Sequence, residues 1–411
     1  MKDTTGAVVA GAKVTVTNSS TNVTHQTTSS KDGDYLFTLL PIGTYQIAVE
    51  AAGFEKYLQT GITLEINQKA RLDVALKVGS TSQVVEVEGN VTQVDTVSAT
   101  LGKVENNTRI ENLPLAARDT MQLGLLQAGV FAPDQDDGSS NPFSVSGQRS
   151  ESMTFLIDGS DNNDFLGNNM VVDPNPDAVD EFKIITNNYE AEYGRTSGGI
   201  VNQVIKSGTN QIHGDVFEYF RNTALDASDY FLQQVPIFRY NLFGATIGFP
   251  IIKDKMFLFA SYQGARRGEG QNTGLQTVLS PAERNGDFSA LLPGLPLINP
   301  ASTNPNQPYF PNNQVPVDPV MKNYINQFMP LPNAPNNGFV ADPVASLSED
   351  QFVLRYDYTF SNKDSLSAFY ILDDQPQTYP LQILSGAAYG GTVPVGSGFS
   401  NSQRFQAGSV S

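Results

Sequence analysis

Apolar and polar residues alternate with a period of two at several places along the chain, which is the pattern of a β-strand with one buried face. In the N-terminal part this pattern occurs at residues 12–17 and 44–49. Turn signals such as Asp32-Gly33 and Pro41-Ile42-Gly43 separate the strands at intervals of about ten residues. Short strands at this spacing predict a β-sandwich over residues 1–78.

The clearest alternation lies near the C-terminus. One face of the predicted strand carries Phe352, Leu354, Tyr356, Tyr358 and Phe360, and the other carries Val353, Arg355, Asp357 and Thr359. The turn at 361–364 follows, and the alternation resumes at 365–370. The pattern predicts a hairpin of about nine residues per strand, and nine to eleven tilted residues span a bilayer with apolar side chains toward lipid.

A second apolar face comprises Phe243, Ala245, Ile247 and Phe249, and the polar Asn241 interrupts it at its start. A short turn follows at Lys253-Asp254, whereas the segment 264–350 holds 13 of the 24 prolines and is incompatible with central strands. Short turns at one end and long loops at the other are typical of outer-membrane barrels. Residues 211–411 are therefore predicted to supply five or six strands, too few to close a barrel.

Residues 79–210 have a mixed α/β pattern, with strands expected near 153–157, 182–185 and 198–206 and a weak helical stripe over 118–126. Five short motifs occur here in a fixed order: Ile110-Glu111-Asn112-Leu113-Pro114, Ser144 to Arg149, Phe155 to Gly159, Glu190 to Gly194, and Ser197 to Asn202. Together they resemble the plug domain of TonB-dependent receptors. The residues that carry this resemblance are Asn112, Leu113, Pro114, Asp158, Gly159, Tyr193, Gly194, Gly198 and Gly199.

The flanking regions add two further resemblances. The first 78 residues resemble the carboxypeptidase-regulatory-like (transthyretin-like) domain, on the motifs Asp32 to Tyr35, Leu40 to Tyr45 and Gly53-Phe54. That family usually has another strand before the turn at 5–7, and no secretory signal follows Met1, so we expect the true start to be missing. The C-terminal part resembles the Oar-like branch of the TonB-dependent receptors.

The segment Gln83-Val84-Val85-Glu86-Val87-Glu88 stands between sandwich and plug. Related receptors carry a short extended segment here, which pairs with the energy-coupling protein TonB by strand addition. The resemblance therefore implies a coupling segment at 83–88, with TonB as partner. The alternative is an ordinary first strand of the plug.

Composition excludes several classes of function. A net charge of −17 disfavours nucleic-acid binding, and the absence of cysteine excludes thiolate metal sites. No zinc-peptidase, nucleophile-elbow or phosphate-loop motif occurs, so we expect neither an enzyme nor a cofactor. The acidic run 158–164 favours a turn over a calcium site, because Asn163 stands where an EF-hand loop needs glycine. Four charged residues of this region either contact the barrel wall or form a solvated face: Glu181, Glu190, Glu192 and Arg195.

The predicted fold is mainly β: an N-terminal β-sandwich, an α/β plug, and the first antiparallel strands of an incomplete transmembrane β-barrel. The family resemblance implies energy-coupled uptake across the outer membrane of a carbohydrate, siderophore or peptide, with the sandwich in the periplasm and the barrel in contact with lipid. The alternative is a cell-surface adhesion or carbohydrate-binding protein built from β-sandwich modules.

Overall fold

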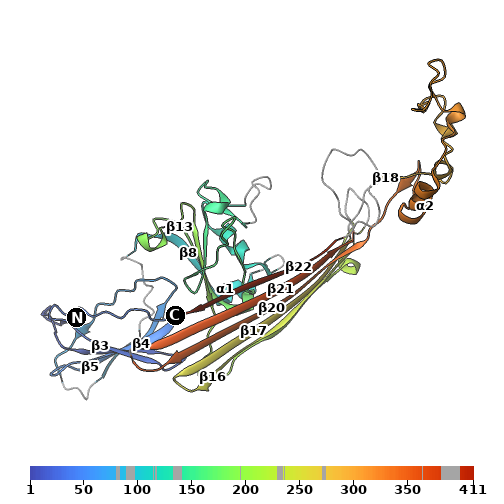
Figure 1. Ribbon diagram of the computed structural model, residues 1–411. Helices are drawn as coiled ribbons and strands as arrows, with labels where there is room; N and C mark the ends of the chain where they lie inside the picture. Colours follow the sequence, from blue (N-terminus) through green and yellow to red (C-terminus); the bar gives the residue numbers. More distant parts are fainter. Residues whose placement is uncertain are drawn as a thin grey trace.

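The computed structural model describes residues 1–79, 84–88, 98–113, 115, 118–132, 141–194, 196–228, 235, 237–270, 275–362, 364–380 and 399–411. Three bodies are visible in Figure 1: a small β domain at the N-terminus, a mixed α/β domain, and a long tilted sheet. Within these described ranges, no helix is long and apolar enough to cross a membrane.

The N-terminal domain is a sandwich of two unequal sheets. The larger has the order β3-β2-β4-β5-β7, and the smaller pairs β1 with β6. Their bounds are Lys2–Asp3 (β1), Lys13–Asn18 (β2), Thr24–Thr28 (β3), Gly43–Glu50 (β4), Lys56–Leu64 (β5), Ala75–Leu76 (β6) and Val84–Glu88 (β7). Alternate residues of β2 and β4, such as Val14 and Ile47, are buried between the sheets.

Two further apolar segments of this domain have little or no strand pairing. Residues 35–37 have no strand pairing, and of 70–76 only the last two residues pair. Tyr35, Phe37 and Leu72 nevertheless pack on the core, and the Tyr35 hydroxyl donates to the Leu72 carbonyl. The apolar pattern there reflects side-chain packing without a backbone ladder. β7 lies beyond the predicted boundary at residue 78 and pairs with β5 of the sandwich sheet.

The α/β domain is built on a five-stranded mixed sheet of order β12-β11-β14-β13-β8. Its elements are β8 (Leu101–Asn106), α1 (Asn107–Asn112), η2 (Thr120–Leu126), β9 (Val130–Phe131), β10 (Ser144–Val145), η3 (Ser150–Ser152), β11 (Thr154–Ile157), β12 (Ser160–Asp161), η4 (Pro176–Ala178), β13 (Val179–Asn187), η5 (Ala191–Tyr193) and β14 (Ile200–Ile205). Phe143, Phe155 and Phe182 fill its core. The helical stripe at 118–126 forms a 3-10 helix, whose first turn is capped by the Asp119 carboxylate.

Six antiparallel strands form the long sheet, in the order β15-β16-β17-β20-β21-β22. Their bounds are Val216–Asn222 (β15), Phe238–Ile252 (β16), Met256–Gly270 (β17), Val344–Thr359 (β20), Ser365–Tyr379 (β21) and Phe399–Val410 (β22). A single turn, η6 (Thr223–Leu225), follows β15. β15 and β22 each pair on one side only, so the described strands form an open sheet, as predicted.

The strands are longer than the nine residues predicted. β17 and β20 remain paired from Met256↔Tyr358 to Gly270↔Val344, so the long loop covers 271–343 rather than 264–350. The prediction failed because outward-facing positions of β20 become polar at Ser346, Ser348 and Asp350 while backbone pairing continues. Fifteen residues at about 3.4 Å each give about 50 Å of strand, well beyond an apolar band of about 25 Å.

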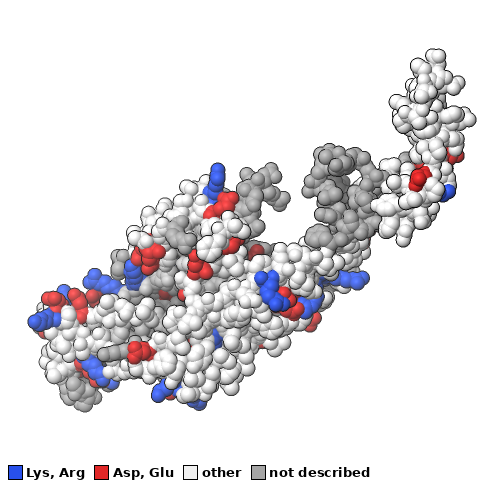
Figure 2. Space-filling model, viewed as in Figure 1, with Lys and Arg blue, Asp and Glu red and all other residues white. Residues whose placement is uncertain are grey.

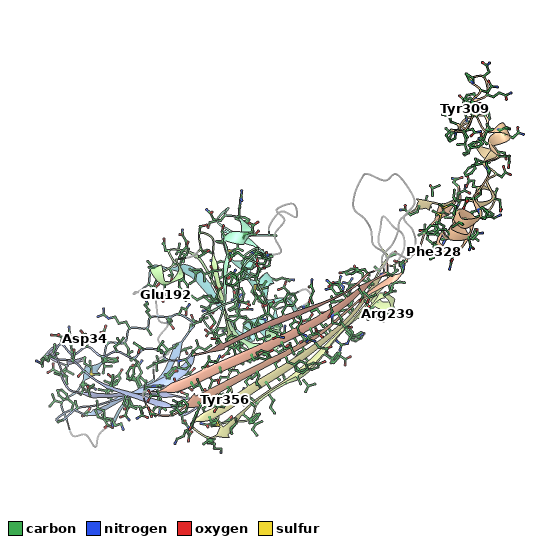
Figure 3. The ribbon with its side chains drawn as sticks, viewed as in Figure 1. Asp34, Glu192, Arg239, Tyr309, Phe328 and Tyr356 are labelled. Atoms are coloured by element: carbon green, nitrogen blue, oxygen red, sulfur yellow. The ribbon has the colours of Figure 1, made fainter. Side chains whose placement is uncertain are left out.

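The described part of the long loop, residues 275–343, carries small elements that are remote from the plug (Figure 1). They are β18 (Gln276–Thr277), η7 (Glu283–Asn285), η8 (Ser289–Leu291), η9 (Pro311–Asn313), α2 (Pro319–Phe328) and β19 (Gly338–Phe339). Tyr309 and Phe328 mark this region in Figure 3. It leaves the sheet at the end opposite the short turns.

The predicted faces of the hairpin are confirmed. Phe352 and Leu354 are 50% and 45% exposed, whereas Val353 between them is 2% exposed. Outward aromatic rings gather at two levels of the sheet. The ring centres of Tyr262 and Phe352 lie 4.8 Å apart, and the rings of Tyr358 and Phe360 pack together nearer to the short turn at 361–364. The stretch 352–360 covers about 26 Å of strand, which at a tilt of about 40° rises about 20 Å, close to the apolar band of about 25 Å between the aromatic girdles of a membrane barrel.

Candidate functional site: the interface between plug and strands

The α/β domain, called the plug from here on, lies against the inward face of the sheet. Ile157, Val172 and Ile205 of the plug pack on Phe259 and Val353 of the strands. The inward-facing residues of a barrel are usually polar. These strand residues are apolar because they contact the plug instead of water. Figure 1 shows the plug over one face of the sheet, nearer to the short turns than to the long loop.

A buried ion pair crosses this interface. Both oxygens of Asp158, in the turn after β11, accept hydrogen bonds of 3.1 Å from Nη1 of Arg355 on β20. The same nitrogen donates to the carbonyl of Ile205, and the Ile205 amide donates to Asp158 Oδ1. Burial raises the pKa of Asp158, while Arg355 opposes that rise. Arg355 therefore joins the sheet to two strands of the plug.

A second carboxylate completes this cluster. Nε of Arg355 donates to Asp357 Oδ2 at 3.0 Å, and Asp357 also accepts from Ser207 of the plug and Ser367 of β21. Asp158 has φ +48° and Gly159 φ +77°, so Asp158-Gly159 forms the predicted turn. Its role in holding the sheet was not visible in the sequence, because 197 residues separate Asp158 from Arg355.

An uncharged contact lies beside the ion pair. Gln351 Oε1 accepts from the backbone and side-chain nitrogens of Asn175, and Gln351 Nε2 donates to the Asp173 carbonyl. The Asp173 carboxylate accepts from Thr120 and from Gln203 inside the plug. Burial raises the pKa of Asp173 to about 7. The plug is thus held here by hydrogen bonds between uncharged side-chain amides and backbone groups.

Arg118 connects the plug to the edge strand β15. Its guanidinium donates two hydrogen bonds to Asp177, of 2.9 and 2.8 Å. On its other side it lies 4.3 Å from the ring centre of Tyr219 and 5.3 Å from that of Phe217. Arg118 therefore combines a buried ion pair within the plug with a cation–π contact to the sheet.

The charges around Tyr193 contact the sandwich, not the barrel wall. Glu181 accepts from the Ile66 amide at 2.7 Å, and Lys183 donates to the Ile66 carbonyl. Lys69 pairs with Glu190, and the side-chain amide of Asn67 donates to the Tyr193 hydroxyl. Glu192 lies at the edge of the plug (Figure 3), and Arg195 lies outside the described residues. We call this set the sandwich–plug contact.

Burial raises the pKa of Glu181 to about 7. The nearby carboxylates of Asp180 and Glu65 push in the same direction, whereas the Ile66 amide and Lys183 oppose them. Glu181 is therefore a group whose charge changes near neutral pH at the junction of two domains.

The sandwich also touches the short turn between β16 and β17. The side-chain amides of Asn22 and Asn210 both donate to Asp254 Oδ1, at 3.0 and 2.7 Å. The Asn210 amide donates to the Ser20 carbonyl. The sandwich therefore contacts both the plug and the end of the sheet where the short turns lie.

The remaining motif residues have structural explanations. A Cβ on Gly198 would lie 2.8 Å from the Ser152 carbonyl, and one on Gly199 would lie 2.7 Å from Val145. Gly194 follows Tyr193 at the end of η5, and Leu113 packs on the plug core after Asn112 ends α1. Pro114 lies outside the described residues. The described motif residues therefore shape the plug through close packing and tight turns.

The acidic run 158–164 uses its oxygens within the protein. Asp161 accepts from the Asn163 amide, and Asp164 accepts from the amides of Leu166 and Gly167. Among the described residues, no group of three or more His, Cys, Asp or Glu side chains is arranged to hold a metal ion.

The candidate coupling segment lies on the sandwich. Residues 84–88 form β7, which pairs in parallel with β5 in the register Lys56↔Val84 to Thr60↔Glu88. Gln83 lies outside the described residues. β7 is therefore not an ordinary first strand of the plug sheet, which was the alternative. Its coupling role stays a prediction.

Comparison with known proteins decides the family. Residues 204–410 match the model of the outer membrane beta barrel domain, and residues 1–77 match the carboxypeptidase regulatory-like domain. This chain belongs to the outer-membrane β-barrel family. Over 264 residues it is 30% identical to the TonB-dependent transporter Oar of Myxococcus xanthus, which covers 61% of this chain and 25% of that protein. The expected Oar-like, TonB-dependent resemblance and the outer-membrane location are confirmed.

Among solved structures, the chain is similar to the outer-membrane transporter YddB of Escherichia coli, with 12% identity and a TM-score of 0.43, over 68% of this chain and 33% of that one. It is also similar to the siderophore receptor PirA of Acinetobacter baumannii, with 14% identity and a TM-score of 0.37, over 75% and 45%. The chain spans about a quarter of the length of the curated relative and under half of each of these structures.

Proposed function

We propose that this chain works in energy-coupled uptake across the outer membrane, as part of a TonB-dependent transporter. The observation that carries the proposal is the manner in which the plug is held. It contacts the inward face of membrane-length strands through the Asp158–Arg355 pair and through uncharged hydrogen bonds such as Asn175–Gln351. An inert plug needs no such polar contacts, because apolar packing alone would hold it.

The membrane orientation follows from the two ends of the sheet. Short turns of outer-membrane barrels face the periplasm and long loops face outward. The sandwich and β7 lie at the short-turn end, where the Asp254 contact is made, and the loop 271–343 lies at the other (Figure 1). Figure 2 shows few charged side chains on the strands except toward the loop end. Arg266 and Asp350 form an ion pair on the outward face. We assign the lipid-facing surface to this face and the periplasm to the sandwich.

In this proposal, TonB binds residues 84–88 by strand addition and pulls on them. The plug then loosens from the strands, and the substrate passes from the outer side to the periplasm. The substrate class stays open among carbohydrate, siderophore and peptide.

The test is binding of the purified periplasmic domain of TonB to the chain in detergent. Strand addition uses backbone groups, so Val85→Pro removes a donor N–H while Val85→Ala changes only a side chain. We expect Val85→Pro to weaken binding at least tenfold and Val85→Ala to leave it within about threefold. Equal binding by the unaltered chain and Val85→Pro would contradict the proposal.

A further inference from the structure

The coupling segment and the sandwich share one sheet. β7 adds to β5 through five registered pairs, and β5 pairs on its other side with β4. In the described sheet, β7 is the last strand in the order β3-β2-β4-β5-β7, so its outer edge has no neighbouring strand there. An open edge presents unpaired N–H and C=O groups in the geometry that an added strand requires.

The chain that follows β5 leads directly to the plug. β5 ends at Leu64, and Ile66, Asn67 and Lys69 then make the sandwich–plug contact on β13 and η5. β5 is therefore flanked by the coupling segment on one edge and continues into the plug contact at its end. Force applied to β7 has a short path to β13 through β5, in addition to the covalent connection along the chain.

From this arrangement we propose that the sandwich presents residues 84–88 to TonB as a preformed edge strand, so that TonB extends the sandwich sheet without displacing β7 from β5. This inference rests on the proposed coupling role of the segment. The partner is a protein that offers a free β-strand edge.

Two physical arguments favour binding of TonB to β7 while β7 stays paired with β5, over binding after β7 has left the sandwich. Freeing β7 would break its five pairs with β5 and expose the β5 edge, which strand addition at the outer edge avoids. A segment already held extended also loses less backbone entropy on binding, and fixing one residue costs about 1–2 kcal/mol. The chain should therefore bind TonB more tightly than a flexible peptide of the same sequence.

The test locks β7 onto β5. The chain has no cysteine, so Thr60→Cys with Glu88→Cys, which are register partners, introduces the only thiols. Neighbouring strands lie about 4.8 Å apart, within the Cα range of disulfides. The control pair is Lys13→Cys with Thr28→Cys, exposed register partners on β2 and β3 that do not touch β7. Binding of the TonB periplasmic domain is measured for both pairs, oxidised and reduced.

We expect the Thr60–Glu88 disulfide to form, the oxidised chain to bind within about twofold of the reduced chain, and a free peptide of residues 83–88 to bind at least tenfold more weakly. Failure of the disulfide to form, or loss of binding on oxidation that reduction restores, overturns the presentation of an edge strand. In that second case the segment still couples but must leave the sandwich. If neither peptide nor any form of the chain binds, the coupling role itself fails and this inference fails with it.

Discussion

Removing Arg355 is expected to weaken the plug–strand interface. In Arg355→Met, Asp158 loses both hydrogen bonds from the guanidinium and Asp357 loses its cation, while the apolar packing of Ile205 and Val353 remains. The Arg355 side chain is 10% exposed and that of Asp158 is 18% exposed, so solvent compensates little. Breaking a buried pair by removing one partner typically costs about 3–5 kcal/mol.

This cost falls on opening of the interface, and hydrogen exchange measures it. The Ile205 amide donates to Asp158, and all residues of β14 are buried. When exchange follows local opening, its rate rises in proportion to the opening equilibrium. At about 1.4 kcal/mol per tenfold, Arg355→Met should speed exchange of the Ile205 amide at the end of β14 by about a hundredfold to several thousandfold.

Two further variants serve as controls for the Arg355→Met prediction. Arg266→Met removes the Arg266–Asp350 pair on the outward face, whose side chains are 40% and 35% exposed, and should leave β14 exchange within about threefold. Asp158→Asn combined with Arg355→Met removes the unpaired charge of Asp158 and should recover much of the protection. Unchanged β14 exchange in Arg355→Met would show that the pair does not hold the plug.

Three more outcomes follow from the same contacts. The pKa of Glu181 lies above its ordinary value, so the contribution of this group is complete below about pH 4.5 and is lost as pH rises through about 7. The protection factor of the Ile66 amide, which is the exchange rate corrected for its intrinsic pH dependence, should therefore fall over that window and stay constant in Glu181→Gln; a constant protection factor in the unaltered chain would refute this. Lys69→Ala removes an exposed pair and should change the stability of the sandwich–plug contact, measured by the same exchange, by no more than about 1 kcal/mol. Arg118→Lys loses the planar guanidinium that pairs with Asp177 through Nη2 and lies over the Tyr219 ring, so urea should release plug protection at a lower concentration than in the unaltered chain, and an unchanged midpoint would contradict the role of the guanidinium.

The outward face of the barrel strands was predictable from sequence because contact with lipid favours apolar or aromatic side chains at every outward position. Every outward side chain from Phe352 to Phe360 is apolar or aromatic, and this signal is local. Inward-facing residues have partners of different kinds, since Val353 packs on the plug core and Arg355 pairs with Asp158. Such pairs join residues far apart in sequence, and no short motif indicates them.

The contacts of the sandwich could not be predicted from the sequence, for a related reason. A parallel pair such as β5–β7 leaves no hairpin signature, because the strands are joined by a long connection. The charges on Glu181 and Glu190 suggested an interface or a solvated surface, and nothing local indicated that the partner was the loop after β5. The plug motifs were visible because close packing at Gly198 and Gly199 fixes residue type within a short segment.

The central claim is that the plug leaves the strands when energy is supplied. The Ser160 hydroxyl donates to that of Ser409 on β22, so Ser160→Cys places a single thiol at this interface in a chain without other cysteines. Its labelling by a membrane-impermeant maleimide is measured in the outer membrane of cells, with and without functional TonB. The account predicts faster labelling with TonB and a slow rate, set by spontaneous opening, without it. Equal rates in the two strains would contradict it.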